Sequence, residues 1–336
     1  MTGRSGIICA GNWIVDLVHD IEHWPAESDL VRIGPQTRGI GGGAANVIAA
    51  LARFDTGIPL WPMGAVGDDD YGAFILDECR ALGLPTSQLH EKAGIATAHT
   101  HVMSVAGQSR TFFYQAGAND GLSAVDFPAG TFAQTNARLF YLGYLTLLGE
   151  LDRLAEDGTT DAARVLQRAQ KAGLSTCVDL VSAHHPAFQA IVAAAAPFID
   201  YLVVNEVEAA RATGTHLTDF AASDPGALAA LGRALVGYGV SKAAIVHSAD
   251  LAVWCGAHGT EIIAAVDPLP PAEIASHLGA GDAFCAGLLY AVHEGWSPDL
   301  ALQLANTAAR ASLRGVTATS AIPPLRTLGL EKANAT

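Results

Sequence analysis

A run of small residues in front of an apolar helix is the first place where this sequence could do chemistry. Residues 278–284 read Leu-Gly-Ala-Gly-Asp-Ala-Phe and lead into an apolar helical pattern. Consecutive backbone N–H groups at the positive end of a helix form a site for an anion such as a phosphate. Asp282 then has two interpretations. It caps the helix, a position that Asp favours, or it is a general base that takes a proton from a hydroxyl attacking a phosphoryl group held by those N–H groups.

A second glycine-rich run occupies residues 39–46, which read Gly-Ile-Gly-Gly-Gly-Ala-Ala-Asn and open another helix. Glycines allow close approach to the backbone, and the start of a helix offers free N–H groups. The spacing also fits a loose dinucleotide-binding fingerprint, which should directly follow a buried strand. Residues 32–38 are instead polar and interrupted by Pro35. A tight packing turn is therefore favoured over a dinucleotide site.

The sequence excludes several other kinds of site. It has no Gly-x-x-x-x-Gly-Lys-[Ser/Thr] loop and only four lysines, which excludes a P-loop enzyme. Its five cysteines are scattered without a Cys-x-x-Cys pair, so we expect buried thiols rather than a zinc site or a disulfide framework. The histidine pairs at 99/101 and 184/185 have no further partners at the spacing that a metal site needs.

Composition limits the class of protein. The 336 residues include 33 acidic and 19 basic side chains, for a net charge of −14. This balance disfavours a nucleic-acid partner and an electrostatic anchor on anionic lipid. Half of the residues are hydrophobic and 15% are charged, which excludes disorder. No apolar window suits a transmembrane helix or a signal peptide, so we expect a cytoplasmic protein without a membrane partner.

The elements that must position the two glycine runs alternate between strands and helices. We predict strands over residues 6–11, 60–66, 137–145, 174–181, 201–204, 243–246 and 251–254, and helices over 44–54, 71–82, 161–172, 186–196, 206–213, 281–293 and 298–313. Such alternation predicts an α/β fold with a largely parallel sheet covered on both faces.

One region departs from this alternation. Residues 96–116 predict a hairpin with a turn at 107–109. Together with residues 13–38 the hairpin is expected to form a small second sheet, so that residues 1–336 make one domain with a lid. We expect Val102, Phe112 and Tyr114 on the outer face of this lid, which would then be too apolar for a monomer.

The two glycine runs, taken together, resemble the signatures of the ribokinase-like (PfkB) family of carbohydrate and nucleoside kinases. Residues 41–46 with 49–52 are similar to the first signature of the family, and residues 278–287 to the second. Further matches occur between them in the family's order. They are Asp16, residues 64–68 with Gly72, Arg110-Thr111 before residues 117–119, and Asn-Glu-Val-Glu at 205–208. The resemblance extends from about residue 6 to residue 324.

The resemblance implies a central, mostly parallel sheet flanked by helices, a small β lid, and transfer of a phosphoryl group from ATP, with Mg²⁺, to a hydroxyl of a small carbohydrate. It implies that Asp282 is the catalytic base and that Gly279, Ala280 and Gly281 form the anion hole. The acceptor hydroxyls would be held by Asp16, Gly42, Gly43 and Asn46. Asn205, His247 and Asn306 would lie at the nucleotide, and Glu208 in the Mg²⁺ network; a structural cap or a surface position fits Asn306 equally well. A homodimer through the lids is also implied.

Two departures from the family pattern affect these expectations. Ser276 stands where the family usually has an aspartate that helps to bind a monovalent cation, so we expect only a weak dependence on potassium. Residues 244–249 read Ala-Ile-Val-His-Ser-Ala and lack the glycine of the usual Thr-x-Gly pattern, which indicates unusual nucleotide affinity or donor choice.

We therefore expect a sugar kinase, with two rivals. A nucleoside kinase would need an aromatic ring that stacks on the base, which Trp13, Phe112 or Tyr114 could supply. A ligand-binding protein that kept the fold and lost turnover would explain the altered nucleotide and cation motifs, but the intact Asp282, Asn205 and Glu208 argue against it. A dehydrogenase that uses NAD is a more distant alternative.

Overall fold

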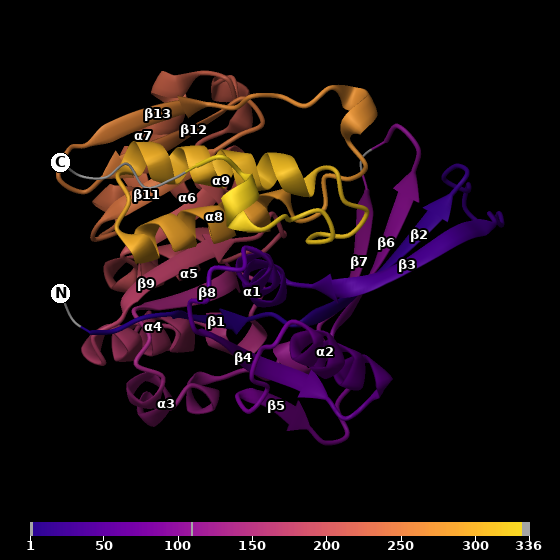
Figure 1. The fold of residues 1–336 in the computed structure, drawn as a ribbon, viewed down its shortest axis with the longest axis horizontal. Helices are drawn as coiled ribbons and strands as arrows, with labels where there is room; N and C mark the ends of the chain where they lie inside the picture. The colour runs from indigo at the N-terminus through magenta and orange to yellow at the C-terminus, as the bar shows by residue number, and fades with distance from the viewer. Residues whose placement is uncertain (1–2, 109, 331–336) are drawn as a thin grey trace.

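The computed structural model describes residues 3–108 and 110–330; Ser109 of the expected turn lies outside this part (Figure 1). Its largest element is a nine-stranded sheet in the order β13-β12-β11-β10-β9-β8-β1-β4-β5. The strands are β1 (Ile7–Gly11), β4 (Leu60–Gly67), β5 (Leu89–Lys92), β8 (Leu139–Leu145), β9 (Ser175–Leu180), β10 (Tyr201–Asn205), β11 (Ala243–His247), β12 (Leu251–Gly256) and β13 (Glu261–Ala265). The predicted, largely parallel sheet is confirmed: β12 runs antiparallel to both of its neighbours, and the other pairs are parallel.

Helices cover both faces of this sheet, as the alternation of strands and helices predicted. One face carries α1 (Gly43–Arg53), α2 (Asp70–Ala81), α8 (Ala280–Glu294) and α9 (Pro298–Ser312), and the other carries α3 (Ala129–Gln134), α4 (Asp161–Lys171), α5 (Phe188–Ala195), α6 (Glu206–Thr213) and α7 (Pro225–Gly237). Successive residues of a strand point to opposite faces. Ile7 and Cys9 accordingly pack into one core, and Ile8 and Ala10 into the other. All five cysteine thiols are free and buried, as expected.

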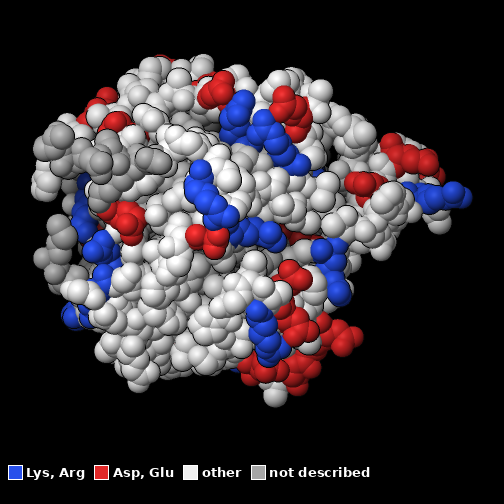
Figure 2. All heavy atoms as spheres, in the orientation of Figure 1, with Lys and Arg blue, Asp and Glu red and all other residues white. Residues whose placement is uncertain are grey.

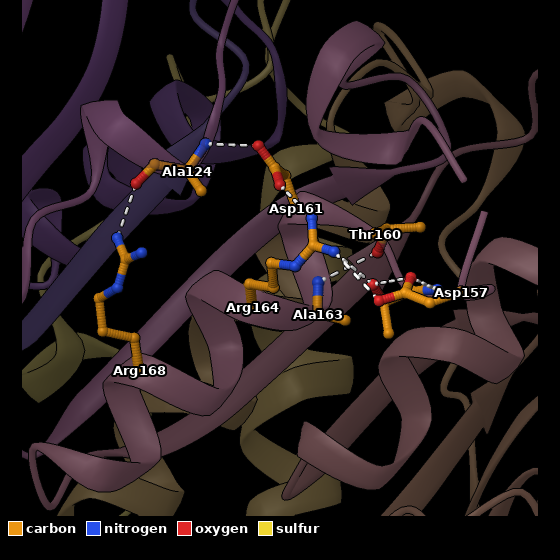
Figure 3. Close-up of polar contacts among 8 residues, drawn as sticks. Ala124, Asp157, Thr160, Asp161, Ala163, Arg164 and Arg168 are labelled. Carbon is orange, nitrogen blue, oxygen red and sulfur yellow. Dashed lines mark hydrogen bonds and ion pairs between the residues drawn. The ribbon is translucent and has the colours of Figure 1, made fainter. Parts of the chain in front are cut away.

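Local capping fixes the start of α4 (Figure 3). The Thr160 side chain accepts a hydrogen bond from the N–H of Ala163 at 3.1 Å, which satisfies a helix-end donor. Asp161 accepts from the N–H of Ala124 at 3.0 Å. Two turns further along, Arg168 donates to the carbonyl of Ala124 at 2.6 Å. The segment that precedes α3 is thereby attached to α4.

A separate four-stranded sheet projects from the body at the right of Figure 1 and forms the expected lid. Its order is β3-β2-β6-β7, with β2 (Ile14–Ile21), β3 (Ile33–Gly41), β6 (His99–Val105) and β7 (Thr111–Gln115). β3 runs through Pro35 into the first glycine run. The run therefore does follow a strand, but β3 is exposed over residues 33–38 and belongs to the lid. A dinucleotide fingerprint needs a buried strand of the main sheet at this position, so the first glycine run does not meet that requirement.

The expected outer face of the lid was assigned wrongly. Phe112 and Tyr114 line a cleft between the lid and the body, and Val102 is fully buried. The opposite face carries Leu17 and Phe113, which are partners of His101 in the register of the sheet. Because side chains alternate along a strand, the sequence of residues 96–116 predicts which positions share a face. It does not predict which of the two faces packs toward the body.

The surface is charged in a mixed pattern. On the face drawn in Figure 2, basic side chains lie among acidic ones. Of the described helices, none is long and apolar enough to cross a membrane.

Candidate active site

A cleft of about 1260 Å³ lies between the lid and the body, beside the carboxyl ends of the central strands. Open α/β sheets bind their ligands outside the carboxyl ends of strands. The lining includes most of the residues expected at the site: Asp16, Gly42, Asn46, Asn205, Glu208, His247, Gly279, Ala280, Gly281 and Asp282. Residues from both ends of the sequence therefore meet in one cavity.

Asp282 lies in the first turn of α8 and is only 5% exposed. Its Oδ2 accepts two hydrogen bonds, from Asn46 Nδ2 at 2.8 Å and from Tyr144 Oη at 3.1 Å. The N-cap of α8 is Gly279, and its helix start has no side-chain cap. Asp282 is therefore not the helix cap, and its carboxylate is bound to side chains of the cleft instead.

Burial raises the pKa of Asp282 to about 7. The hydrogen bonds from Asn46 and Tyr144 oppose this rise, and the charges of Asp16 and Glu208 add to it. A carboxyl group with a pKa near the working pH can accept and return a proton with little cost. The environment of Asp282 suits a general base.

Residues 279–281 begin α8 directly beside this carboxylate. Gly279 has φ 76°, and a Cβ there would lie 2.4 Å from Cβ of Ala318, so the position requires glycine. Gly281 packs beside His247, whose ring stacks on Phe284 at 4.5 Å between centroids. Burial lowers the pKa of His247 to about 4, so its imidazole is neutral at pH 7. The helix start remains the main electropositive feature next to Asp282.

The first glycine run positions the acceptor side of the cleft. A Cβ at Gly41 would lie 2.2 Å from Oδ2 of Asp16, and Gly42 (φ 90°) is the N-cap of α1. Asp16 is 7% exposed and has a pKa raised by burial to about 7, against the hydrogen bond from Thr100 and the charge of Arg110. The glycines therefore admit a buried carboxylate from the lid, while α1 brings Asn46 to Asp282.

Arg110 adds a cation to this acidic cleft. It is the one Lys or Arg among the described lining residues, and its Nη1 is buried without a hydrogen-bond partner. Burial lowers the pKa of Arg110, and the negative charges of Asp20 and Asp16 oppose this lowering.

Asn205 and Glu208 form a capping box at the start of α6. The N–H of Asn205 donates to Oε2 of Glu208 at 3.0 Å, and the N–H of Glu208 donates to Oδ1 of Asn205 at 2.8 Å. Oε1 of Glu208 accepts from Ser182 Oγ and from Asn205 Nδ2, both at 2.9 Å. Burial raises the pKa of Glu208. Both of its oxygens are occupied, and the described residues contain no group of three or more His, Cys, Asp or Glu side chains arranged around a metal position.

Asn306 is not among the residues that line the cleft. It lies on α9, and its Nδ2 donates to the carbonyl of Ala265 on β13 at 3.5 Å. The expected contact with a nucleotide stays a prediction.

The three candidate stacking rings occupy different positions. Trp13 is fully buried below the lid, where its indole donates to the carbonyl of Met63 at 3.0 Å, so it cannot stack on a ligand. Phe112 and Tyr114 remain in the cleft.

The sequence motifs missed Tyr144, Tyr141 and Asp179. Asp179 accepts from Tyr141 Oη and from the N–H of Tyr144, both at 2.7 Å. Burial and the charge of Asp282 raise the pKa of Asp179 far above its usual range. Polar residues in or just after the strands over 137–145 and 174–181 were the only available signal, because the carboxyl ends of parallel strands meet at one edge.

Comparisons with a family model and with solved structures match nearly the whole length of this chain. A family model described as pfkB family carbohydrate kinase matches residues 5–325. A ribokinase from Giardia lamblia superposes with a TM-score of 0.77 at 18% identity, over 96% of this chain and 98% of that one. A ribokinase from Arabidopsis thaliana, solved with ribose and ATP, gives 0.75 at 22% identity and 97% of both chains. A nucleoside kinase from Burkholderia thailandensis, solved with inosine, gives 0.70 at 17% identity, over 96% and 95%.

Proposed function

Because the chain belongs to the pfkB family of carbohydrate kinases, we propose that it transfers the γ-phosphoryl group of MgATP to a hydroxyl of a small carbohydrate. The observation that carries this proposal is the position of Asp282, a buried carboxyl group with a pKa of about 7 beside the start of α8. Phosphoryl transfer depends mainly on positioning and on charge stabilisation. This juxtaposition of a base and an electropositive helix end supplies both.

In the proposed reaction, the carboxylate of Asp282 takes the proton of the acceptor hydroxyl as that oxygen bonds to phosphorus. The bond from phosphorus to the leaving oxygen of ADP breaks, and the backbone of residues 279–281 stabilises the charge on the transferred group. Asp16 and Asn46 hold acceptor hydroxyls in front of the base. Carboxylate and amide groups suit this task because both accept or donate hydrogen bonds to hydroxyls.

The residues at the start of α6 fit a hydrated Mg²⁺ in their chemistry. Mg²⁺ keeps several waters and binds through one or two carboxylates together with substrate phosphates, where it neutralises phosphate charge. Because both oxygens of Glu208 already accept hydrogen bonds, we propose that Glu208 and Asn205 reach the ion through water. His247 and Asn306 are proposed to lie toward the nucleotide.

A nucleoside is the second candidate acceptor. Phe112 lines the cleft with 53% of its surface exposed, and a free aromatic face can stack on a base. We give preference to a sugar because the acceptor side carries a buried carboxylate and an amide in Asp16 and Asn46. For either acceptor we propose that the protein works in the cytoplasm as a homodimer.

A ligand screen followed by an activity assay tests the proposal. Thermal unfolding is measured with sugars and nucleosides, each with and without MgATP; a ligand at 100 Kd adds roughly 2.7 kcal/mol to stability. Acceptors that stabilise the protein are then assayed for ADP release. Turnover with a sugar supports the proposal. Turnover with nucleosides alone overturns the sugar as acceptor and supports the second candidate, a nucleoside. Binding without ADP release from any acceptor overturns the kinase and favours a binding protein.

A further inference from the structure

Tyr144 is a cleft residue in an unusual backbone conformation. It has φ 59°, in the left-handed region that non-glycine residues rarely adopt. The pairing of β8 with β9 shifts register between Leu142 and Leu145, at this point in the chain. Strained residues persist only where their surroundings hold them, and they cluster at functional sites. The departure from regular strand geometry brings the Tyr144 side chain into the cleft.

Two contacts hold Tyr144 in this position, and Tyr141 supports one of them. Its N–H donates to Oδ1 of Asp179 at 2.7 Å, and Tyr141 donates to the other oxygen of the same carboxylate at 2.7 Å. Its ring lies against Gly43, where a Cβ would come within 2.7 Å of Cδ1 of Tyr144. The glycine at the start of α1 therefore leaves room for this ring, and the buried carboxylate anchors its backbone.

The Tyr144 hydroxyl donates to Oδ2 of Asp282, the oxygen that also accepts from Asn46. Burial and the neighbouring carboxylates raise the pKa of Tyr144 far above 10, so the hydroxyl keeps its proton and acts only as a donor. Two donors from two different elements fix the orientation of the carboxylate. Among the described residues no further donor is bonded to Asp282, which leaves Oδ1 for the acceptor.

We propose that Tyr144 is a positioning residue for the base: with Asn46 it fixes Oδ2 of Asp282, favours the ionised form of the carboxyl group, and directs Oδ1 at the acceptor hydroxyl. The inference rests on the proposed function. In the transfer step the acceptor proton moves to Oδ1, and Tyr144 neither gains nor loses a proton. A hydrogen bond to the charged form favours that form, so Tyr144 extends the activity of the base to lower pH.

Other ionisable groups also lie near Asp282, and a variant that tests Tyr144 has to leave them unchanged. They are Asp16 on β2, Glu208 on α6, Asp179 on β9, Tyr141 on β8 and Cys285 on α8. Tyr144→Phe keeps the ring against Gly43 and removes only the hydroxyl. Tyr201→Phe is the matched control, because Tyr201 is a half-buried tyrosine at the start of β10, outside the lining of the cleft, where its ring packs against Trp254 at 5.8 Å between centroids.

The first measurement is the pH dependence of kcat/KM. In Tyr144→Phe we expect the acid limb to move to higher pH by about half a unit to one unit, within the spread of about one unit that pKa values show among folded proteins. Activity should then be several-fold low at pH 6.5 and recover at pH 8.5, while the control Tyr201→Phe keeps the parent's acid limb. A loss of activity that is equal at both pH values indicates general structural damage and overturns the inference.

The second measurement does not need turnover and separates this inference from the proposed function. A buried carboxyl group with a raised pKa makes the fold less stable as pH rises from about 4 to its folded pKa. Tyr144→Phe should extend this fall in Tm to higher pH, and the extension should vanish in the Asp282→Asn background. If the parent phosphorylates no acceptor but the Tm profiles behave in this way, the function fails and the Tyr144–Asp282 coupling stands. Identical Tm profiles for the parent and Tyr144→Phe overturn the coupling.

Discussion

At the scale of single residues, the main result is that Asp282 is buried without being a helix cap. Both interpretations remained open in the sequence, because Asp is favoured at the starts of helices. In the structure the N-cap is Gly279, and the carboxylate binds Asn46 and Tyr144. The polar contacts of Asp282 therefore lie in the cleft.

Asp282→Asn tests this function directly. We expect kcat to fall by ~10²–10⁴, as is typical when general-base catalysis is lost. ATP and the acceptor should still bind, because removing a negative charge near phosphates does not weaken their attraction. The measurements are kcat in a coupled ADP assay and affinity by calorimetry. Turnover within about threefold of the parent, well under 1 kcal/mol of barrier, would show that Asp282 is not the base.

The stability of the same variant separates a catalytic from a structural function. The folded pKa of Asp282, about 7, lies above its ordinary value of 3.8. Its ionisation therefore costs stability between about pH 4 and pH 7. Asp282→Asn should be more stable than the parent at pH 8, and this gain should disappear at pH 4. A variant that is inactive and also less stable at pH 8 would point to lost packing.

Ser276 gives a second prediction at this scale. It is 4% exposed, lines the cleft, and its Oγ accepts from the N–H of Leu278 at 2.9 Å. A neutral hydroxyl that is already bonded is a poor substitute for a carboxylate ligand of a monovalent cation. Activity should change less than about twofold when sodium or a bulky organic cation replaces potassium. A large, saturable stimulation by potassium would show that other oxygens suffice.

At the scale of elements, hydrophobic periodicity predicted the sheet and most of its helices, because strands and helices of an α/β fold bury different patterns of residues. It did not predict β13, nor that β12 runs antiparallel to both of its neighbours, since the hydrophobic pattern of a buried strand is alike in either direction. It also misread residues 33–38, where Pro35 suggests a break although the edge strand β3 tolerates it. Tyr144 was missed for a related reason: a register shift in β8 depends on Asp179 and Gly43, which are distant in sequence.

The junction of β3 and α1 can be tested at Gly41. A Cβ there would lie 2.2 Å from the Asp16 carboxylate, so Gly41→Ala must displace Asp16 from its position. We expect KM for the acceptor to rise at least about tenfold, equivalent to ~1.4 kcal/mol, with KM for ATP little changed. Gly130→Ala is the control, because that position in α3 has open space and the change should add about 0.5–1 kcal/mol of stability. Equal KM values for the two variants would contradict the placement of Asp16 at the acceptor.

At the scale of the whole molecule, the two faces of the lid have different surroundings. One face closes the cleft with Asp16, Thr100 and Tyr114. The other carries Leu17 and Phe113 on either side of His101, and Phe113 is 54% exposed. The ring of His101 also stacks on the ring of His19, and its Nδ1 lies within hydrogen-bond distance of His19 Nε2, at 2.9 Å. An exposed aromatic beside half-buried apolar and imidazole groups is typical of a surface that meets a partner.

We expect two copies of the chain to associate through this face of the lid, so that closing a lid over one cleft involves the other copy. Sedimentation at micromolar concentration should then give twice the chain mass of 34.7 kDa. Phe113→Asp places a charge in the centre of the contact and should shift the mass to that of one chain, because an unpaired charge is costly to bury. Val125→Asp is the control: Val125 is 83% exposed beside the start of α4, and its replacement should leave the dimer intact. A parent protein that sediments near 34.7 kDa, or a Phe113→Asp variant that keeps the dimer mass, would place the contact elsewhere or remove it.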